Sequence, residues 1–579
     1  MPVLTRHFTQ IETILIDISR YSTIGDAFFE AVRSYGSSAL LAVPKNPSRV
    51  YLPDGLELTY AQAAEQVQYL ISVYSQAGYG VGHRVGLSLE NRPEHILHKL
   101  ALNSLGVCCV PLNPDYRPQE LAYIISHSRV DVIISLRTHL KNIIDAVGRH
   151  ASMPSIVCVE SFAQELSPPK ILKEHVKPNS DTPASILYTS GTTGKPKGCV
   201  LSHRYELAAG AWYANTGGLA DIQENQERLF NPLPLYHVNA SVLSFYCMLL
   251  TGNCQIQADR FQPKRWWEEI VTSRATIAHY LGVIVPMLLN QPTVPREREH
   301  RIRFGFGAGV EPTLHQTFED RFGFPLVEIW GMTEMVRTLS VSSPPRQVGS
   351  RAFGKQAPGL EVRVVDDQGR DVLENNPGEM LIRHSAREPR KDFFSGYLDD
   401  PEATESAWRG GWFHTGDVVT RDSGGMLHFV DRNKHIIRRS GENISAAEVE
   451  AILQAHPLVK MVAVLGVTDE VREQEVLACV CLSEHARTIM NDWSAEERQK
   501  IAISLFKHCS EHLAYYKAPG WILLVDDLPT TGTQKIQKHM IFDNSLDPRS
   551  VKEICDLRHL KKREYRENPY RLNYLNDVR

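Results

Sequence analysis

The stretch LYTSGTTGKPKGCVLSH, from Leu187 to His203, concentrates groups that can hold an anion. Its hydroxyl side chains can donate hydrogen bonds, its glycines let backbone N–H groups approach closely, and its lysines add positive charge. These residues are Thr189, Ser190, Gly191, Thr192, Thr193, Gly194, Lys195, Lys197 and Gly198. The stretch therefore predicts a phosphate-binding loop behind a strand that ends at 184–187. The alternative is an ordinary polar loop, since Gly, Thr, Ser and Lys are common in loops.

The spacing of these residues excludes the common P-loop. The pattern G-x-x-x-x-G-K-[ST] requires a glycine five residues before Gly194 and a Ser or Thr directly after Lys195. Thr189 and Pro196 occupy those positions. The loop therefore belongs to another class of phosphate-binding site.

The sequence before the loop alternates between strand and helix patterns. Apolar runs at 84–89, 107–112 and 131–136 predict strands, and apolar residues at helical spacing predict helices between them and after the N-cap residue Thr59. Such alternation is typical of a parallel sheet covered by helices, in which ligands bind at the carboxyl ends of the strands. The loop at 187–203 occupies such a position, so we expect an α/β fold.

Three short stretches after the loop carry further functional groups. NPLPLYHVNA places an aromatic residue beside His237, although a single histidine is more often structural than catalytic. IWGMTE ends in Glu334, and carboxylates are ligands that Mg²⁺ prefers. WFHTGDVV presents Asp417 in a glycine turn, where a carboxylate can accept hydrogen bonds from two hydroxyls. A Gly-Asp pair is common by itself, so only its combination with the other motifs indicates a site.

The last third of the sequence predicts two smaller units. GLEVRVVDDQGRDV and GEMLIRH alternate like strands joined by an Asp/Gly turn and predict a β subdomain. Ser445 and Glu448 form an S-x-x-E capping box, which predicts a helix after Ser445. Strands at VKMVAVLGV and EVLACVCL, with a helix near 496–513, predict a small α+β domain. The segment 547–579 predicts a solvated or subunit-contacting extension.

Composition excludes several classes of protein. A chain of 579 residues that is 42% hydrophobic and 22% charged is ordinary for a globular protein of several domains. Its net charge of -4 indicates no attraction to nucleic acid or anionic membranes. The ten cysteines lack C-x-x-C spacing, so we expect reduced packing residues. No apolar run approaches the roughly 18 residues of a membrane span, and no secretory signal is recognisable, so we expect a cytoplasmic enzyme.

The string YTSGTTGKPKG is similar to the signature loop of the acyl-adenylate-forming (AMP-binding) superfamily, which includes acyl-CoA synthetases, firefly luciferase and the adenylation domains of peptide synthetases. FVDRNKHIIRRSGENISAAEVE resembles a second signature, and together with PLYHVNA it is similar to the branch that contains carnitine and crotonobetaine CoA ligases. The resemblance covers about 22–544. It implies a large multi-subdomain AMP-binding domain at 1–433 with parallel or mixed sheets and a β subdomain, a small mobile α+β domain at 434–545, and a polar extension at 546–579.

The resemblance also implies an activity: an acid attacks ATP to give acyl-AMP and pyrophosphate, and coenzyme A then displaces AMP. The implied catalytic residues are Lys535, His237 and Thr333. The implied ATP-binding residues are Thr189, Ser190, Gly191, Thr192, Thr193, Gly194, Lys195, Gly309, Trp330, Gly331, Met332, Thr333, Asp417 and Arg432, and the implied Mg²⁺ ligands are Glu334 and Thr193. The acyl pocket would comprise His237, Asn239, Tyr280, Gly305 and Gly307. Lys434 would be the hinge, and Arg439, Ser440, Gly441 and Glu442 would form the coenzyme A loop.

Two positions depart from the family pattern. Trp330 stands where Tyr is usual; it offers the same flat face to adenine but lacks the hydroxyl. Gln534 replaces the glycine before the catalytic lysine, which makes Lys538 the alternative if the register is misread. The glycines at 307–309 also have an alternative role, in strand packing alone.

Three other functions share some or all of these motifs. A carrier-protein-loading adenylation enzyme would share them all, although no carrier domain is expected after Asn544, and a luciferase-like oxygenase would share most. The third, a non-catalytic relative, is disfavoured because Lys535, Glu334 and Asp417 are retained. We expect a small-molecule acid, ATP and coenzyme A as partners, with no nucleic acid and no membrane span, and leave a homodimer open.

Overall fold

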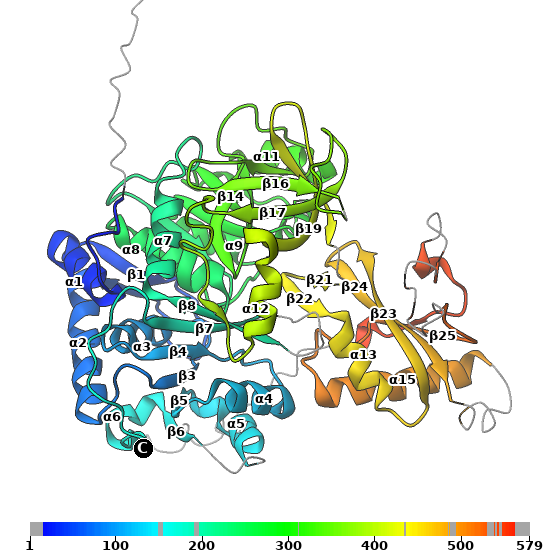
Figure 1. Ribbon diagram of the computed structural model, residues 1–579, viewed down its shortest axis with the longest axis horizontal. Helices are drawn as coiled ribbons and strands as arrows, with labels where there is room; N and C mark the ends of the chain where they lie inside the picture. Colours follow the sequence, from blue (N-terminus) through cyan, green and yellow to red (C-terminus); the bar gives the residue numbers. More distant parts are fainter. Residues whose placement is uncertain are drawn as a thin grey trace, which may run out of the picture.

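The computed structural model describes residues 16–148, 154–189, 196–310, 312–366, 368–432, 436–483, 486, 494–529, 536, 538, 541–542 and 547–561. These residues form a large domain and a small domain, and the small domain lies at one end of the longest axis (Figure 1). The described strands of the large domain form three sheets, and those of the small domain form one. This arrangement agrees with the predicted fold.

The first sheet of the large domain contains the predicted strand-helix-strand units. Its order is β18 (Gly396–Tyr397), β8 (Lys197–Ser202), β7 (Pro183–Thr189), β4 (Cys108–Pro111), β3 (Arg84–Ser88), β5 (Val132–Ser135) and β6 (Ser155–Cys158). Strands β7, β4, β3, β5 and β6 are parallel neighbours. Strands β4 and β5 are buried throughout, as expected for the near-continuous apolar runs of a parallel sheet covered on both faces. The predicted alternation is confirmed.

The second sheet contains the strands that carry the predicted acyl-pocket residues Tyr280, Gly305 and Gly307. Its order is β14 (Met335–Ser340), β13 (Leu326–Met332), β12 (Phe304–Ala308), β11 (Ile277–Leu281), β9 (Arg228–Asn231), β10 (Cys254–Gln257), β1 (Ala39–Val43) and β2 (Leu56–Thr59). The third sheet is the predicted β subdomain, in the order β15 (Ala352–Lys355), β20 (Met426–Arg432), β19 (Phe413–Arg421), β17 (Gly378–Arg383) and β16 (Glu361–Val365). Its strands pair antiparallel, as the alternation predicts.

Helices pack around these sheets, most of them in one large apolar core, while α4 and α5 form a second cluster with β4 and β5. Those described in the large domain are α1 (Ile24–Tyr35), α2 (Tyr60–Gln76), α3 (Pro93–Ser104), α4 (Pro118–Ser128), α5 (Leu140–Val147), α6 (Phe162–Glu165), α7 (His203–Ala214), α8 (Phe245–Leu250), α9 (Trp266–Thr272), α10 (Ile284–Leu289), α11 (Pro312–Phe322) and α12 (Pro401–Ala407). Helix α2 begins where the sequence predicts, because Thr59 and Gln62 form a capping box. Among the described residues, no helix is long and apolar enough to cross a membrane.

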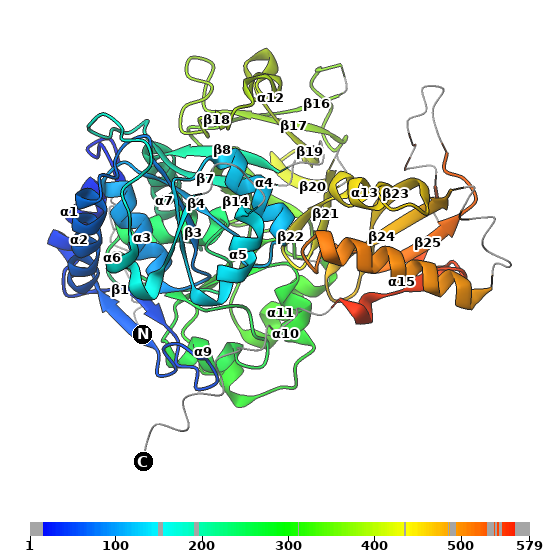
Figure 2. The same cartoon turned by 90° about the horizontal axis from the view of Figure 1, so that it is seen from below.

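In the small domain, two described helices pack against one sheet. The sheet contains β22 (Glu442–Ser445), β21 (Ile436–Arg439), β24 (Glu473–Leu482), β25 (Trp521–Val525) and β26 (Cys555–Asp556), with β23 (Val459–Asp469) also paired to β24. Helix α13 (Ala446–Gln454) begins directly after Ser445, as the capping box predicts, and α15 (Ala495–His512) matches the other predicted helix. The two helices contact each other, α15 also contacts α4 of the large domain, and Figure 2 shows α15 on the near side of the small domain.

Candidate active site

A cavity of about 2690 Å³ lies between the large and small domains. Its lining includes residues from the ends of β7, β11, β12 and β13, from the β subdomain, and from the loop between β21 and β22. The carboxyl ends of parallel strands meet there, where open α/β sheets bind ligands. The cavity is therefore the candidate active site.

The phosphate-binding loop connects β7 to its antiparallel neighbour β8, so the ends of a β-hairpin hold it. Ser190, Gly191, Thr192, Thr193, Gly194 and Lys195 lie outside the described residues. The two ends are described: Thr189 and Lys197 both line the cavity. The described ends of the predicted loop therefore both lie at the cavity.

Glu334 faces these two ends of the loop. It lines the cavity together with Thr333 and Tyr397, and the Tyr397 hydroxyl donates to Glu334 Oε1 at 2.8 Å. The Lys197 ammonium lies 4.7 Å from the centre of the Tyr397 ring. Burial, with the nearby Glu334 carboxylate, raises the pKa of the Tyr397 hydroxyl, so it stays a donor. The backbone oxygen of Thr333 accepts from Tyr205 at 2.7 Å, which fixes this turn.

The residues around Glu334 fit a hard cation bound with a nucleotide. A carboxylate at a polar cavity wall is a suitable oxygen ligand for Mg²⁺, which normally keeps few protein ligands and takes the rest from phosphates and water. No group of three or more His, Cys, Asp or Glu side chains that could hold a metal occurs among the described residues. A cation at Glu334 would therefore depend on nucleotide oxygens for most of its ligands.

Trp330 and Asp417 meet in a way that the sequence did not indicate. The indole Nε1 of Trp330, on β13, donates to Asp417 Oδ2 on β19 at 2.8 Å. The two residues are 6% and 1% exposed. They lie behind Gly331 and Gly416, which line the cavity, rather than in the lining itself. Trp330 therefore contacts the predicted ribose acceptor directly.

The T-G-D turn orients Asp417 through its backbone. The Asp417 N–H donates to Thr415 Oγ1 at 3.1 Å, and that hydroxyl donates to the Met380 carbonyl at 2.6 Å. Gly416 has φ of 69°, a conformation that favours glycine. The β19–β20 register places Arg432 opposite Asp417, although the Arg432 side chain lies outside the described part of the chain. The IWGMTE and T-G-D motifs, which are far apart in the sequence, therefore meet at Asp417.

Four of the predicted acyl-pocket residues line the cavity: His237, Asn239, Tyr280 and Gly307. We call the part of the cavity around them the acyl end. Gly307 permits a close approach of β12 to β11, because a Cβ there would lie 2.2 Å from the Tyr280 carbonyl oxygen. Gly305 packs against Leu326 instead, where a Cβ would meet Cδ2 at 2.7 Å, so its role is in strand packing. Other residues lining this end are mostly aliphatic: Val238, Leu243, Leu281, Val283, Ile284, Met287, Ile329 and Val336.

Buried partners fix the polar side chains of the acyl end. The Tyr280 hydroxyl donates to Glu328 Oε1 at 2.6 Å, and Glu328 Oε2 accepts the Gly309 N–H at 3.0 Å. Burial raises the pKa of Glu328. Asn239 Oδ1 lies 2.8 Å from His279 Nδ1 and accepts from Asn231 at 3.1 Å. Glu328 and His279 were not predicted, because neither belongs to a motif.

The predicted coenzyme A loop is the tip of the β21–β22 hairpin. Ser440 and Gly441 have φ of 52° and 85°, and Arg439 pairs with Glu442, as in a two-residue hairpin turn. The tip presses on the large domain, because a Cβ on Gly441 would lie 2.3 Å from Leu281 Cδ1.

Glu442 carries the hairpin's contact with the acyl end. Its Oε2 lies 3.4 Å from His237 Nε2, and its Oε1 accepts from the Tyr236 hydroxyl at 3.4 Å. Burial raises the pKa of Glu442, but His237, Lys517 and Tyr236 together outweigh it and leave the pKa lowered. The hairpin therefore reaches the acyl end as an anionic tip.

A buried ion triad joins the two domains beside this hairpin. Lys517 of the small domain donates to Glu120 on α4 at 2.7 Å and to Glu448 on α13 at 2.9 Å. Burial opposes the charge on Lys517, but the two carboxylates raise its pKa. Asn113 also donates to the Tyr516 hydroxyl at 3.2 Å. These contacts hold the small domain with its hairpin in the cavity.

The remaining predicted residues are only partly placed at the cavity. Lys535 and Lys434 lie outside the described residues. Lys538, the alternative to Lys535, pairs with Glu450 at 2.6 Å on the small domain itself. Gly309, Gly331 and Met332 lie at the ends of β12 and β13, and the last two line the cavity.

Comparisons with known proteins agree with this geometry. The AMP-binding enzyme family model matches residues 41–398, and the AMP-binding enzyme C-terminal domain model matches 448–535. The chain is 28% identical over 497 residues to crotonobetaine/carnitine–CoA ligase of Citrobacter koseri, covering 83% of this chain and 92% of the relative, and 26% identical to the Proteus mirabilis ligase, covering 84% and 93%.

Solved structures give the same result. A malonyl-CoA ligase complex with methylmalonyl-CoA and AMP is 25% identical with a TM-score of 0.68, covering 85% of this chain and 96% of that one. The o-succinylbenzoate CoA synthetase of Bacillus subtilis, at 22% identity and a TM-score of 0.73 over 89% and 97%, shares the fold. The chain belongs to the AMP-binding enzyme family, and within it to the acyl-CoA synthetases, the ATP-dependent ligases that join a carboxylic acid to coenzyme A.

Proposed function

We propose that this acyl-CoA synthetase activates a small or medium carboxylic acid with an apolar chain, and that both half-reactions use the cavity between the domains. The described lining of the acyl end is mainly aliphatic and aromatic, which supports this substrate class. A second charge on the acid would be costly there unless it met a partner.

In the first half-reaction, a carboxylate oxygen of the acid attacks the α-phosphorus of ATP, and the bond to pyrophosphate breaks. Thr189 and the loop at 190–195 hold the phosphates, Thr333 contacts the α-phosphate, and Asp417 accepts the ribose hydroxyls. Lys535 stabilises the charge that develops on the phosphate oxygens. Bound at Glu334, with Thr193 as the second proposed ligand, Mg²⁺ would neutralise phosphate charge.

In the second half-reaction, the sulfur of coenzyme A attacks the acyl carbon, and the bond to the AMP oxygen breaks. The observation that carries the proposal is the approach of the small-domain hairpin to the acyl end, where Glu442 Oε2 lies 3.4 Å from His237 Nε2. This arrangement suits the thioester step, and we propose that His237 positions the acyl carbonyl. Rotation about Lys434 would bring Lys535 into the cavity for the first half-reaction.

Three further points are part of the same proposal. The large domain ends at residue 433 and the small domain at about 545, so that Lys434 lies at the boundary. The protein works in the cytoplasm, and a homodimer is compatible with the reaction but has no part in it.

The test is AMP release with and without coenzyme A across butyrate, hexanoate, octanoate, benzoate, malonate and carnitine. We expect release that depends on coenzyme A with one of the apolar acids. Preference for malonate or carnitine would contradict the substrate class. Adenylate formation with every productive acid, but no thioester, would instead favour a carrier-protein thiol as acceptor.

A further inference from the structure

Residues 547–561 fold onto the small domain, although the matched family model ends at residue 535. Strand β26 pairs antiparallel with β25, with Cys555 opposite Ile522 and Asp556 opposite Trp521. Cys555 and Leu557 are buried in the small-domain core. The sequence predicts a solvated or subunit-contacting extension here, but its described part completes a sheet because its apolar residues have a core to cover.

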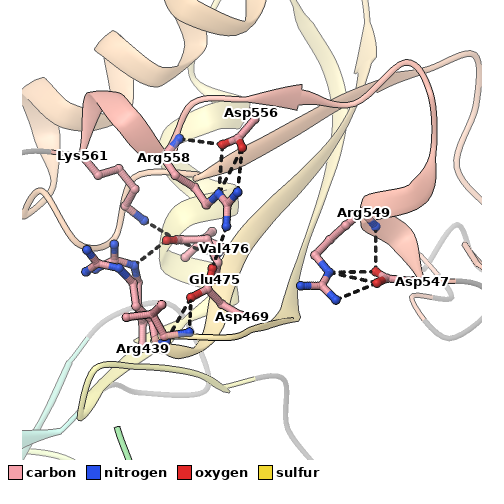
Figure 3. Close-up of polar contacts among 11 residues, drawn as sticks. Arg439, Asp469, Glu475, Val476, Asp547, Arg549, Asp556, Arg558 and Lys561 are labelled. Atoms are coloured by element: carbon pink, nitrogen blue, oxygen red, sulfur yellow. Dashed lines mark hydrogen bonds and ion pairs between the residues drawn. The ribbon is translucent and has the colours of Figure 1, made fainter. Parts of the chain in front are cut away.

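An arginine also ties this segment to the sheet. Arg558 Nη1 pairs with Asp469 at the end of β23 at 3.0 Å (Figure 3). Its guanidinium lies 4.2 Å from the centre of the Trp521 ring. Arg558 is partly exposed, so this pair contributes little to stability. It nevertheless fixes the direction of the chain just before Lys561.

Lys561 enters a fully buried ion network. Its ammonium donates to Glu475 Oε1 at 2.5 Å, and Arg439 Nε donates to Glu475 Oε2 at 2.8 Å (Figure 3). The exposed fractions of the three side chains are 0%, 0% and 2%. Each carboxylate oxygen thus accepts from its own nitrogen donor, and burial lowers the pKa of Lys561 to about 7. Removing one member of such a buried group leaves the others with an incomplete set of partners, which is costly.

Arg439 links this network to the reaction. It is the last residue of β21, directly before the hairpin tip that contacts Leu281. Its guanidinium points back into the small domain toward Glu475, while its strand partner Glu442 approaches His237. The place of the hairpin tip in the cavity therefore depends on the anchor that Glu475 provides for Arg439.

We propose that Lys561 is a positioning residue for thioester formation: it orients Glu475, Glu475 holds Arg439, and Arg439 holds the hairpin at the acyl end. This inference rests on the proposed function. The first half-reaction should not require this network, because it uses Thr333, Glu334 and Asp417 of the large domain together with Lys535, which is not a member of the network. Residues 547–561 are then a part of the small domain that thioester formation requires.

The test separates the two half-reactions in the full-length protein. The acid with the highest coenzyme A-dependent AMP release in the panel above serves for pyrophosphate release, and its synthetic adenylate with coenzyme A serves for the thioester step. We expect Lys561→Met to slow the thioester step about 10- to 100-fold, because a small misplacement of the reacting groups lowers the rate by about this factor. Pyrophosphate release should stay within about twofold of the wild-type rate. Lys552→Met, at an exposed lysine of the same segment, should change neither rate.

A double-variant cycle tests the path through Arg439. If Lys561 acts through Arg439, then Lys561→Met in an Arg439→Met background should slow the thioester step by no more than about twofold further. Lys561→Gln, which keeps a neutral donor of similar length, gives the same comparison if thermal melting shows that the Met variant is unfolded.

Several results would overturn the inference. They are equal slowing of both half-reactions in a folded Lys561 variant, a Lys561→Met enzyme that behaves like Lys552→Met, and full additivity with Arg439→Met. Failure of the proposed function gives a different result, because wild-type protein would then show no coenzyme A-dependent AMP release with any acid of the panel.

Discussion

The nucleotide end of the cavity and the small-domain hairpin opposite it are held by different kinds of contact. At the nucleotide end, short motifs from different sheets place Glu334 beside Tyr397 and Trp330 beside Asp417, all within the large domain. The hairpin instead depends on buried ion networks in which Lys517 meets Glu120 and Lys561 meets Glu475.

The difference follows from what each region must do. The nucleotide end belongs to one packed domain and can use local turns such as T-G-D. The hairpin belongs to a domain that we propose to rotate, so the contacts of that domain with the large domain, such as Lys517 with Glu120, must form and separate. Buried ion pairs suit this role because they are geometrically specific while adding little net stability. Variants at the two ends should therefore affect different half-reactions.

The largest expected effect is that of Lys535→Ala on adenylation. Loss of a cation that meets transition-state charge typically costs about 3 to 4 kcal/mol, or roughly 100- to 1,000-fold in rate. Pyrophosphate release in a single turnover measures it, and thioester formation from synthetic acyl-AMP should be spared. Lys538→Ala is the matched control, since that lysine pairs with Glu450. If Lys538→Ala alone abolishes adenylation, the register across Gln534 is wrong.

Asp417→Ala should have the next largest effect, at the nucleotide end. A hydrogen bond to a charged group contributes about 1.5 to 3 kcal/mol, so the apparent affinity for ATP should fall roughly 10- to 150-fold. The KM for ATP in the pyrophosphate-release assay measures the change. The KM for coenzyme A should stay constant, because the hairpin does not contact Asp417 in the described structure. An unchanged KM for ATP would remove Asp417 from the nucleotide site.

Glu120→Gln tests the contact between the two domains beside the hairpin. It removes one carboxylate from Lys517 but keeps an oxygen for the Arg117 N–H that caps α4. We expect a loss of about 1.5 kcal/mol from the domain arrangement, which slows the thioester step about tenfold and spares adenylation. Stopped-flow measurement of each half-reaction separates them, with Glu65→Gln on the exposed face of α2 as control. Slower adenylation with an unchanged thioester step would contradict this role for the triad.

Sequence reasoning identified the strands, the β subdomain and the residues within motifs, because local pattern carries those signals. Glu334 and Asp417 could be named because W-G-x-T-E and T-G-D occur together with the other motifs of the family that the sequence resembles. Contacts between distant residues could not be predicted: Trp330 and Asp417 are 87 residues apart, Lys561 and Glu475 are 86 apart, and Lys517 and Glu120 are 397 apart. Each depends on how separate elements pack, and a lone buried lysine has no periodic signature.

Trp330→Phe has the smallest expected effect, and it tests the contact between Trp330 and Asp417 at the nucleotide end. Phenylalanine keeps a flat apolar face but loses the N–H that donates to Asp417 at 2.8 Å. If that bond orients the carboxylate for the ribose, its loss should raise the KM for ATP about three- to tenfold, as expected for a single bond of about 0.5 to 1.5 kcal/mol.

Trp330→Tyr, which restores a donor at the end of the ring, should recover part of the loss. Neither variant should change the thioester step from synthetic acyl-AMP by more than about twofold, since the hairpin is anchored elsewhere, and distant changes act independently. Tighter ATP binding by Trp330→Phe would show instead that the indole competes with the ribose for Asp417. The Trp330–Asp417 bond would then be a contact that ATP must break, and the nucleotide end would resemble the hairpin in having contacts that form and separate during the reaction.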